Sequence, residues 1–405
     1  MPTMQFSAIV TLMVAAGVFS VPVAMPESAP LLEARQGTPI PGKYIVKMKD
    51  SGLNIDTTYV VLKLLKGSAD QIYNIGSFQG FAAEMSESVV NILRRLPSVE
   101  YVEKDAIVQV SWAAEEAEIV EKRAPVSQVA TSWGLGRISN IDPGNSIYTY
   151  DDSAGSNTCS YVIDTGIYTA HPEFEGRAMF LANFAGDGSN NDGYGHGTHV
   201  AGTVGSKTYG VAKKTKLYSI KVLSNSGSGS ISGVMAGINF AANDAKSRGC
   251  AKGAVANLSL AASMSAALNT AVARAVATGL FVVAGAGNAA TDANNTSPAS
   301  APTAFTVGAT DISDKFASFS NFGPSVDILA PGVSILSTSN TGGTQIKSGT
   351  SMATPHVAGL AAYLLSLEGK KSPSDLAARI TALAQKGKIT GVPAGTSNLL
   401  ISNRV

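Results

Sequence analysis

The chain has 405 residues, and its 30 lysines and arginines nearly balance its 29 aspartates and glutamates, for a net charge of +1. This length allows one large domain with a smaller one, and the balanced charge argues against nucleic acid or an anionic membrane surface as a partner. Hydrophobic residues make up 45% of the chain beside 41 glycines. That combination is typical of a folded protein with tight turns, and it excludes a disordered one.

The chain begins with an apolar run, Phe6 to Ala24, that ends in small residues. Although no lysine or arginine precedes it, the run predicts a secretory signal peptide over residues 1–20, with cleavage between 20 and 24. A single membrane anchor is the alternative, because the run nearly reaches spanning length. The run is strictly N-terminal and is followed closely by Pro22 and small residues, so we expect secretion and no membrane association.

A compact block of its own lies between residues 41 and 110. Strand-like alternation occurs at 44–49, 78–85 and 99–110, and helix-like spacing at 58–65 and 86–96. The pattern predicts a small split βαβ domain of the α+β class. Residues 113–123 are charged, lack an apolar face and end in Lys122-Arg123. They indicate an exposed, cleavable linker, although a solvated helix would be equally accessible.

From residue 124 onward, short apolar runs alternate with helical stretches. The runs are typical of parallel strands buried on both faces, and they cover 160–163, 217–222, 254–260, 280–284, 304–307 and 326–329. The helical stretches are 199–204, 232–247, 266–278, 349–364 and 374–383. This alternation predicts a doubly wound α/β domain. Its sheet is mostly parallel, helices cover both faces, and active groups lie at the carboxyl ends of the strands.

The most informative stretch is Gly349 to Leu364, which reads GTSMATPHVAGLAAYL. Its apolar residues fall on one helix face, and Pro355 lies near the start, where a missing N–H costs little. Ser351 is thereby placed at or just before the helix N-terminus. Free backbone N–H groups and the positive end of the helix dipole stabilise negative charge there. An ordinary N-cap serine is the alternative interpretation.

Three further polar residues are placed at strand ends or at a helix start. Asp164 ends a buried strand at a glycine turn, His196 opens a helix between glycines, and Asn288 follows a glycine-rich strand end. Asp and Asn also form ordinary turns at such places. His196 and His199 could suggest a metal pair, but they lack a third ligand and the glutamate of an H-E-x-x-H site.

Together the segments D-T-G, G-H-G-T-H-V-A-G and G-T-S-M-A-T-P-H-V-A-G resemble the subtilisin family of serine proteases, and within it the proteinase K-like secreted fungal branch. The order Asp164, His196, Asn288, Ser351 differs from that of chymotrypsin-like enzymes, and Ser351 lacks the G-x-S-x-G of esterases. The resemblance implies a subtilisin-like fold for residues 124–405. It also implies that residues 21–123 are an inhibitory propeptide.

The resemblance implies a role for each of the four residues. Ser351 is the nucleophile, His196 the general base and then acid, and Asp164 orients His196. The Asn288 amide and the Ser351 N–H form the oxyanion hole. These roles suit the residue types, because a serine hydroxyl needs an adjacent base, imidazole titrates near neutral pH, and a buried carboxylate fixes its tautomer.

The same resemblance implies a cleft in which a peptide substrate lies as an added strand between two edge segments. A specificity pocket at 284–286 would favour large apolar side chains before the scissile bond. The chain departs from the usual S-L-G-G of the second edge by carrying Ala261 and Ala262, whose methyl groups could narrow the pocket or shift the peptide. The implied substrate-binding residues are Gly227, Ser228, Gly229, Ser259, Leu260, Ala261, Ala284, Gly285 and Ala286.

Further features follow from the resemblance. Cys159 and Cys250 occupy disulfide positions of that branch, whereas two cysteines alone are equally compatible with buried free thiols. Asp327 with the carbonyls of Pro302 and Ala304 matches a calcium site, and oxygen ligands suit that ion. No cofactor is expected for the chemistry. Two overlapping glycosylation sequons start at Asn294 and Asn295 in a predicted surface loop, and a third, at Asn257, lies in a buried strand.

The sequence therefore predicts a secreted, monomeric serine endopeptidase, made as an autoinhibited zymogen and acting on proteins and peptides through an acyl-enzyme on Ser351. Its propeptide would assist folding, since parallel sheets fold slowly, and would block the cleft until it is cut near Arg123. Two alternatives remain: a catalytically silent relative that acts as a binder, and a metal-dependent hydrolase.

Overall fold

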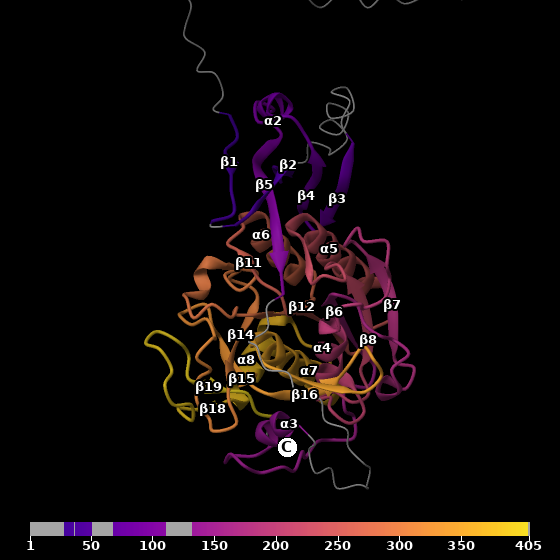
Figure 1. The fold of residues 1–405 in the computed structure, drawn as a ribbon, viewed down its shortest axis with the longest axis vertical. Coiled ribbons are helices and arrows are strands. Elements are labelled where there is room, and N and C mark those ends of the chain that lie inside the picture. The colour runs from indigo at the N-terminus through magenta and orange to yellow at the C-terminus, as the bar shows by residue number, and fades with distance from the viewer. Residues whose placement is uncertain (1–27, 36, 51–67, 111–131, 404–405) are drawn as a thin grey trace, which may run out of the picture.

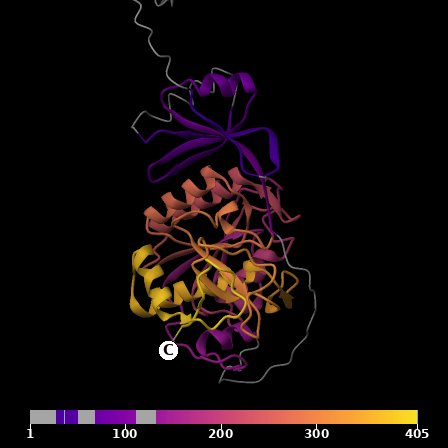
Figure 2. The same ribbon diagram turned by 90° about the vertical axis from the view of Figure 1, so that its left-hand side faces the viewer.

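The computed structural model describes residues 28–35, 37–50, 68–110 and 132–403. These residues form a small N-terminal unit stacked on a larger one (Figures 1 and 2). The predicted signal peptide, the helix expected at 58–65 and the linker at 113–123 lie outside the described residues. No helix in the described part of the chain is both long and apolar enough to cross a membrane.

The small unit, here called the pro-domain, is a sheet with the strand order β1-β5-β2-β4-β3, and in the described part of this unit one helix lies on its outer face. The strands are antiparallel apart from β1, which runs parallel to β5. The predicted strands and the predicted helix at 86–96 are confirmed, and β3 is an addition. The elements are β1 (Leu31–Leu32), β2 (Pro39–Met48), β3 (Ala69–Ile75), β4 (Phe78–Glu84), α2 (Glu87–Leu93) and β5 (Val99–Gln109).

The large unit, here called the peptidase domain, is built on a sheet with the order β18-β19-β15-β14-β12-β10-β6-β8-β7. All neighbours run parallel except β18 and β19, which confirms the mostly parallel sheet. Its strands are β6 (Thr158–Asp164), β7 (Ala178–Asn183), β8 (Lys216–Lys221), β10 (Gly253–Leu258), β12 (Phe281–Gly285), β14 (Phe305–Thr310), β15 (Ile328–Pro331), β18 (Gln385–Lys386) and β19 (Leu399–Leu400).

Helices and small two-stranded pairs complete the peptidase domain. The helices are α3 (Trp133–Ser139), α4 (His196–Gly205), α5 (Ile231–Ser247), α6 (Ala266–Ala277), α7 (Thr350–Glu368) and α8 (Pro373–Leu383), with short helices η1 (Pro172–Phe174) and η2 (Ala293–Asn295). Outside the main sheet, β11 (Ala262–Ser263) pairs with β13 (Thr296–Ser297), and β16 (Ile335–Thr338) pairs with β17 (Thr344–Lys347). β9 (Ser228–Ser230) pairs with the pro-domain strand β5.

Each face of the peptidase sheet carries its own hydrophobic core. Along β6, Val162 joins the core shared with α4, α7 and α8, whereas Tyr161 and Ile163 join the core shared with α5 and α6. Successive side chains of a strand point to opposite faces, so α4 and α7 lie on one face and α5 and α6 on the other. This arrangement confirms the doubly wound α/β class. Figure 2 shows the pro-domain seated above the helices of the second face.

The start of α7 differs in detail from the prediction. Gly349 is the N-cap and Ser351 the second helical residue, so the N-cap interpretation of Ser351 is wrong. Pro355 is the sixth residue of α7, beyond the first turn in which its missing N–H would cost nothing. The carbonyl of Ser351, four residues earlier, therefore loses its usual helical donor. The Ser259 hydroxyl takes that place and donates to the carbonyl at 2.9 Å.

Candidate active site

A buried carboxylate–imidazole pair lies at the carboxyl end of β6. Oδ1 of Asp164 and Nδ1 of His196 are 2.7 Å apart, and both side chains are fully buried. The same carboxylate oxygen accepts the backbone N–H of Thr165 at 2.7 Å. These contacts fix the ring orientation and favour a proton on Nδ1, which leaves Nε2 for exchange with a reacting group.

The position of His196 depends on residues that sequence reasoning did not single out. Oδ1 of Asp192 accepts from the Gly195 N–H at 2.7 Å, and its Oδ2 accepts from the Thr198 N–H at 2.8 Å. The Thr165 hydroxyl donates to Oδ1 of Asp192 at 2.8 Å and accepts from the Gly197 N–H at 2.9 Å. A carboxylate suits the positive start of α4. Asp192, between Asn and Gly before a helix start, was the sequence signal that could have revealed this cap.

Ser351 lies in the first turn of α7, which packs against α4. Its hydroxyl donates to the carbonyl of Ser259 at 3.2 Å. Its backbone N–H is one of the first-turn donors that have no acceptor within the helix. The fold thus places Ser351 and His196 in the first turns of two helices on the same sheet face. Nucleophile–base contacts are often long before substrate binds, so this geometry is compatible with a serine–histidine pair.

Asn288 follows β12 and reaches the start of α7. Its Oδ1 accepts from the backbone N–H of Thr350 at 2.8 Å and from the Thr350 hydroxyl at 2.9 Å. With the carbonyl oxygen occupied in this way, the amide nitrogen faces the other way. A small cavity of about 10 Å³ has Asn288 and Ser351 in its wall, together with Leu260, Ala261, Gly285, Gly287 and Thr350. The predicted oxyanion residues are therefore brought together.

The other three histidines are bound to backbone carbonyls. Nε2 of His199 lies 2.9 Å from the Ile335 carbonyl, Nδ1 of His356 lies 2.9 Å from the Met352 carbonyl, and Nε2 of His171 lies 2.9 Å from the Gly343 carbonyl. Burial lowers the pKa of His199 to about 3 and that of His356 to about 4, so both are neutral at physiological pH. Among the described residues, no group of three or more His, Cys, Asp or Glu could hold a metal ion.

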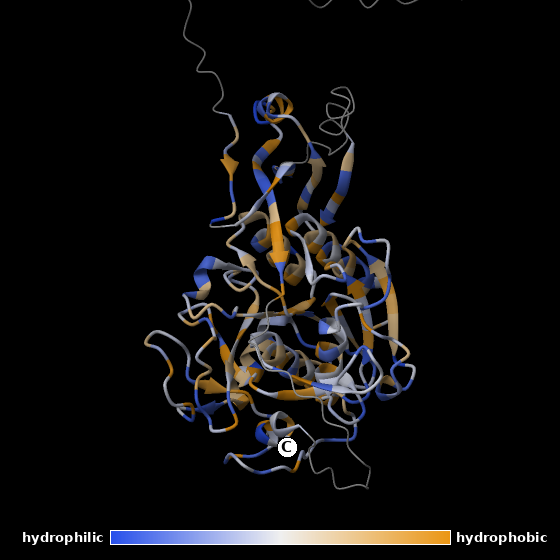
Figure 3. Cartoon of the chain, viewed as in Figure 1, coloured by the Kyte–Doolittle hydropathy of each residue, from blue (hydrophilic) through white to orange (hydrophobic). Residues whose placement is uncertain are grey.

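The two predicted edges of the cleft hold the end of the pro-domain strand β5. On one side Val108 pairs with Gly229 and Gln109 with Ser228 in an antiparallel ladder, and the Val110 N–H donates to the Gly227 carbonyl at 3.1 Å. On the other side Gln109 forms an antiparallel bridge with Ala261. Figure 3 shows that β5 turns hydrophobic where it enters the peptidase domain. The cleft thus binds an extended peptide by strand addition.

The three residues predicted to line the specificity pocket are not equivalent. Gly285 lines the cavity beside Ser351, whereas the side chains of Ala284 and Ala286 belong to the two hydrophobic cores on opposite faces of the sheet. Side chains two residues apart on a strand share a face, and Ala286 departs from that pattern because it lies beyond the end of β12 at Gly285. Of the two substituted positions, Ala261 lines the cavity, but Ala262 pairs with Ser297 in a separate short sheet.

The remaining predicted sites lie away from the catalytic centre. Cys159 and Cys250 form a disulfide, which confirms that prediction and rules out two free thiols. Asp327 is half-buried, and its Oδ2 accepts the Thr306 N–H at 2.7 Å. Burial raises the pKa of Asp327 to about 6, because no cation lies beside it among the described residues. Asn294 and Asn295 are exposed, whereas Asn257 is buried in β10.

A histidine–carboxylate pair, a helix-borne serine and an amide that share a peptide-binding cleft define a serine protease. Comparison with protein families supports that class: the model of the subtilase family matches residues 155–397, and that of peptidase inhibitor I9 matches residues 43–111. The chain belongs to the subtilase family of serine proteases, and it carries an inhibitor domain of the I9 kind.

Relatives match this chain over nearly its whole length. The cuticle-degrading protease of Metarhizium anisopliae is 49% identical over 99% of this chain and 100% of its own. Proteinase R of Parengyodontium album is 48% identical over 93% of this chain and 92% of its own. The crystal structure of a cold-adapted subtilisin-like serine proteinase superimposes with a TM-score of 0.64 at 42% identity, covering 67% of this chain and 98% of that one.

Proposed function

We propose that this chain is a secreted serine endopeptidase that acts as a monomer on proteins and peptides, without nucleic-acid or membrane partners. It hydrolyses peptide bonds through an acyl-enzyme formed on Ser351. The observation that carries the proposal is the fully buried 2.7 Å contact between Asp164 and His196, on the sheet face from which Ser351 also projects. Its relatives are named as proteases, one of them as a cuticle-degrading protease.

In the proposed mechanism, Ser351 Oγ leaves the Ser259 carbonyl and attacks the carbonyl carbon of the scissile bond. Its proton passes to Nε2 of His196, and Asp164 stabilises the imidazolium that forms. The Asn288 amide and the Ser351 N–H stabilise the negative oxygen of the tetrahedral intermediate. His196 then gives the proton to the leaving amine as the C–N bond breaks. A water molecule then gives a proton to the same ring and attacks the acyl carbon, and the ring passes that proton to Ser351 Oγ as the ester C–O bond breaks and the acid product leaves.

The chain is proposed to be made as an autoinhibited zymogen. Support comes from the pro-domain strand, which occupies both edges of the cleft with Val108, Gln109 and Val110. A substrate would need the same hydrogen-bonding groups, so the two compete. Release is proposed to follow cleavage near Arg123, which lies outside the described residues. The signal peptide proposed for residues 1–20 and the exposed sequons at Asn294 and Asn295 fit a secreted glycoprotein.

A preference for large apolar side chains before the scissile bond is also proposed. This preference follows from the family, and the cavity beside Ser351, about 10 Å³ with Ala261 in its wall, must widen to admit such a side chain. Ala261→Gly would remove one methyl group, so it should raise the ratio of kcat/KM for Phe over Ala substrates by about 10-fold, the usual effect of one methyl or methylene in an apolar pocket. Ala262→Gly is the matched control, because Ala262 does not line the cavity. An unchanged ratio in Ala261→Gly would contradict this assignment.

Asp327 and the carbonyls of Pro302 and Ala304 are proposed to hold a structural calcium ion. The observation that fits is the half-buried Asp327 carboxylate, which has no ion-pair partner among the described residues. A bound cation would supply that partner, and calcium prefers carboxylate and carbonyl oxygens. The ion would stabilise the fold, and no step of the reaction is assigned to it.

The deciding experiment compares the wild type with Ser351→Ala, each expressed as the full chain, on an Ala-Ala-Pro-Phe anilide. Loss of the nucleophile should lower kcat by about 10⁶-fold, the loss known for a subtilisin. A serine-directed irreversible inhibitor should abolish wild-type activity, whereas a metal-dependent hydrolase would resist it. If the mature wild type is folded but inactive on peptides, it is a silent binder and the proposal fails.

A further inference from the structure

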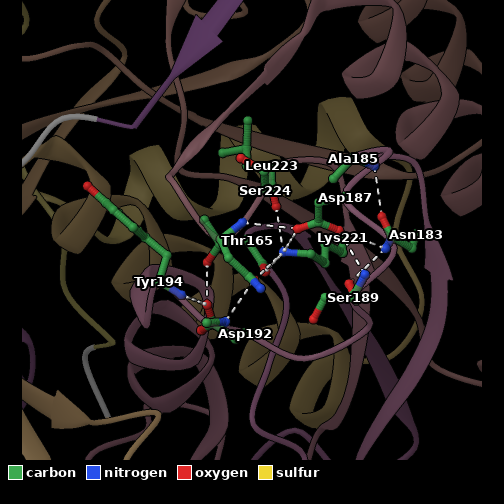
Figure 4. Close-up of polar contacts among 12 residues, drawn as sticks. Thr165, Asn183, Ala185, Asp187, Ser189, Asp192, Tyr194, Lys221, Leu223 and Ser224 are labelled. Carbon is green, nitrogen blue, oxygen red and sulfur yellow. Dashed lines mark hydrogen bonds and ion pairs between the residues drawn. The ribbon is translucent and has the colours of Figure 1, made fainter.

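Lys221, the last residue of β8, is a fully buried lysine beside the catalytic strand. Figure 4 shows its ammonium group between Thr165 on one side and Asp187 on the other. Nζ lies 2.7 Å from the Thr165 carbonyl, 2.8 Å from the Leu223 carbonyl, 3.1 Å from Asn225 Oδ1 and 3.2 Å from Asp187 Oδ2. A buried charge is costly to desolvate, and methionine would fill the same space without that cost. The ammonium group therefore calls for an explanation beyond packing.

One acceptor leads directly to the catalytic pair. Thr165 follows Asp164, and its N–H donates to the same carboxylate oxygen that contacts His196. Its hydroxyl contacts Asp192, which caps the helix that begins with His196. Lys221 thus binds the carbonyl of Thr165, and the N–H and hydroxyl of Thr165 help to orient Asp164 and His196.

The other acceptors lead to the first edge of the cleft. Leu223 and Asn225 lie in the segment that runs from β8 to β9, where the pro-domain strand pairs. Oδ1 of Asn225 also accepts from the Gly193 N–H at 3.0 Å, three residues before His196. Asp187 Oδ2 accepts from the Asn225 N–H at 3.0 Å, so the counter-ion holds the same turn.

We propose that Lys221 is a positioning residue, which ties the strand end that carries Asp164 to the edge segment that binds substrate. Asp187 is its counter-ion. The ammonium has three N–H donors, and the Thr165 carbonyl, the Leu223 carbonyl and the Asn225–Asp187 pair surround them from three chain segments. A neutral side chain would free these segments to shift relative to one another. This inference rests on the catalytic roles proposed for Asp164 and His196.

The test compares Lys221→Met with a matched control, Lys213→Met, both expressed as the full chain. Lys213 is also buried, and its Nζ lies 3.1 Å from each of the carbonyls of Lys207 and Thr208. No contact of Lys213 leads to the catalytic pair or to the cleft edge. Activity is referred to the concentration of competent sites, titrated with a serine-directed inhibitor, so that unfolded protein does not count.

Well below its melting temperature, Lys221→Met should lower kcat by about 10- to 100-fold, the cost of a small misalignment of reacting groups. Its kcat/KM should fall further for a tetrapeptide that pairs with the cleft edge than for a single-residue ester. Lys213→Met should keep kcat within about twofold, whatever its loss of stability. If Lys221→Met behaves like Lys213→Met, the proposal is overturned and Lys221 serves only stability.

Asp187→Asn provides a milder variant in case Lys221→Met does not fold, and it should lower kcat in the same direction by a smaller factor. The low-field NMR resonance of the His196 Nδ1 proton gives a second readout in either variant. We expect it to move or broaden when the Asp164 contact loosens, and an unmoved signal with normal kcat would overturn the proposal. Failure of the proposed function would look different from failure of this inference. In that case Ser351→Ala would keep full activity, while the His196 Nδ1 proton resonance would still be present.

Discussion

The pro-domain and the peptidase domain bury their sheets in different ways. The peptidase sheet has helices on both faces, supplied by its own chain segment, so each face has a core of its own. Among the described residues, α2 is the helix that covers the outer face of the pro-domain sheet, over side chains such as Val46 and Phe81. Its inner-face side chains, among them Ile45, Tyr73 and Phe78, belong to the core of the peptidase helices α5 and α6.

The peptidase domain thus covers both faces of its sheet with its own helices, whereas the pro-domain needs the peptidase domain to cover its inner face. The pro-domain buries that inner face against the peptidase helices α5 and α6. Two pro-domain carboxylates also form hydrogen bonds to the peptidase domain. Glu103 accepts from the Ser265 hydroxyl and the Ala267 N–H at the start of α6, and Asp105 accepts from the hydroxyl and N–H of Ser232 at the start of α5. Helix N-termini stabilise such charges.

The largest expected effect follows from separating the two domains. Exposing Tyr73, Ile75 and Phe78, all fully buried in the structure, would cost roughly 1.5–3 kcal/mol each. That sum approaches the whole stability of a small domain. We expect the isolated pro-domain to show no cooperative thermal transition by circular dichroism, and to fold when Ser351→Ala peptidase is added. A cooperative transition in the isolated pro-domain would break the comparison.

Next in size is the disulfide, which reinforces only the peptidase domain. Cys159 and Cys250 are 91 residues apart in sequence, and a loop of that length predicts a loss of about 4.6 kcal/mol when the bridge is removed. The double variant Cys159→Ala/Cys250→Ala should therefore melt about 10 °C lower. Its kcat should be unchanged, since neither cysteine contacts the catalytic groups. An equal melting temperature measured by calorimetry would refute this.

The calcium site proposed at Asp327 is expected to add a smaller increment, again only to the peptidase domain. At 100 times its Kd, calcium should contribute about 2.7 kcal/mol. Without calcium, the Asp327 carboxyl has a pKa of about 6 in the folded state and of 3.8 in the unfolded state. Between these two pH values the folded state therefore holds a proton that the unfolded state has released. Stability from this group therefore falls as pH rises from about 4 to 6.

Calorimetry of the wild type and Asp327→Asn, with calcium or with chelator, checks both statements. Asp327→Asn should lose the stabilisation by calcium and also the fall of stability between about pH 4 and 6. If calcium stabilises both proteins equally, the ion binds elsewhere and the assignment of Asp327 is wrong.

The smallest expected effect is a pH dependence of pro-domain binding. Burial raises the pKa of Glu103 and of Asp105 in the complex above their ordinary values of 4.5 and 3.8. The complex of pro-domain and peptidase domain then binds more protons than the separated domains. The affinity of the pro-domain therefore rises as pH falls toward those values and weakens as pH rises. Inhibition constants of the added pro-domain across this range measure the effect. The pair Glu103→Gln and Asp105→Asn should flatten the curve, and a curve that keeps its slope would contradict this origin.

Much of the peptidase domain could be predicted from sequence because its central strands are buried on both faces. Runs such as 160–163 and 217–222 are mostly apolar, with Ser160, Ser219 and Lys221 as the polar exceptions, and the structure places β6 and β8 there. The edge strand β7 escaped prediction, since partial exposure leaves it without a clear pattern, and Met179 is more than half exposed. Strand β9 reads Ser-Gly-Ser, which has low strand propensity. It is a strand only because β5 pairs with it.

The site shows the same division. Asp164, His196, Asn288 and Ser351 stand in short segments with strong local signals, glycines and helix starts, and so they could be found. Lys221 and Asp192 act through contacts between segments distant in sequence, with Thr165 and Asp187. The contacts of Lys221 leave no local pattern, whereas Asp192 stands just before a helix start and could have been recognised there. The core that each of Ala284 and Ala286 joins also depended on where β12 ends, at Gly285, which the sequence does not state.

The Cys159–Cys250 bridge affects what happens when one copy of this protease cleaves another. The covalent ring that it closes contains Asp164, His196 and the first cleft edge, but neither Asn288 nor Ser351. The exposed turn around Gly186 and Gly188 lies inside that ring. A copy nicked there by autolysis keeps both fragments joined by the bridge. A nick in the exposed turn at 341–343, outside the ring, frees the fragment that bears Ser351 from any covalent link to its histidine.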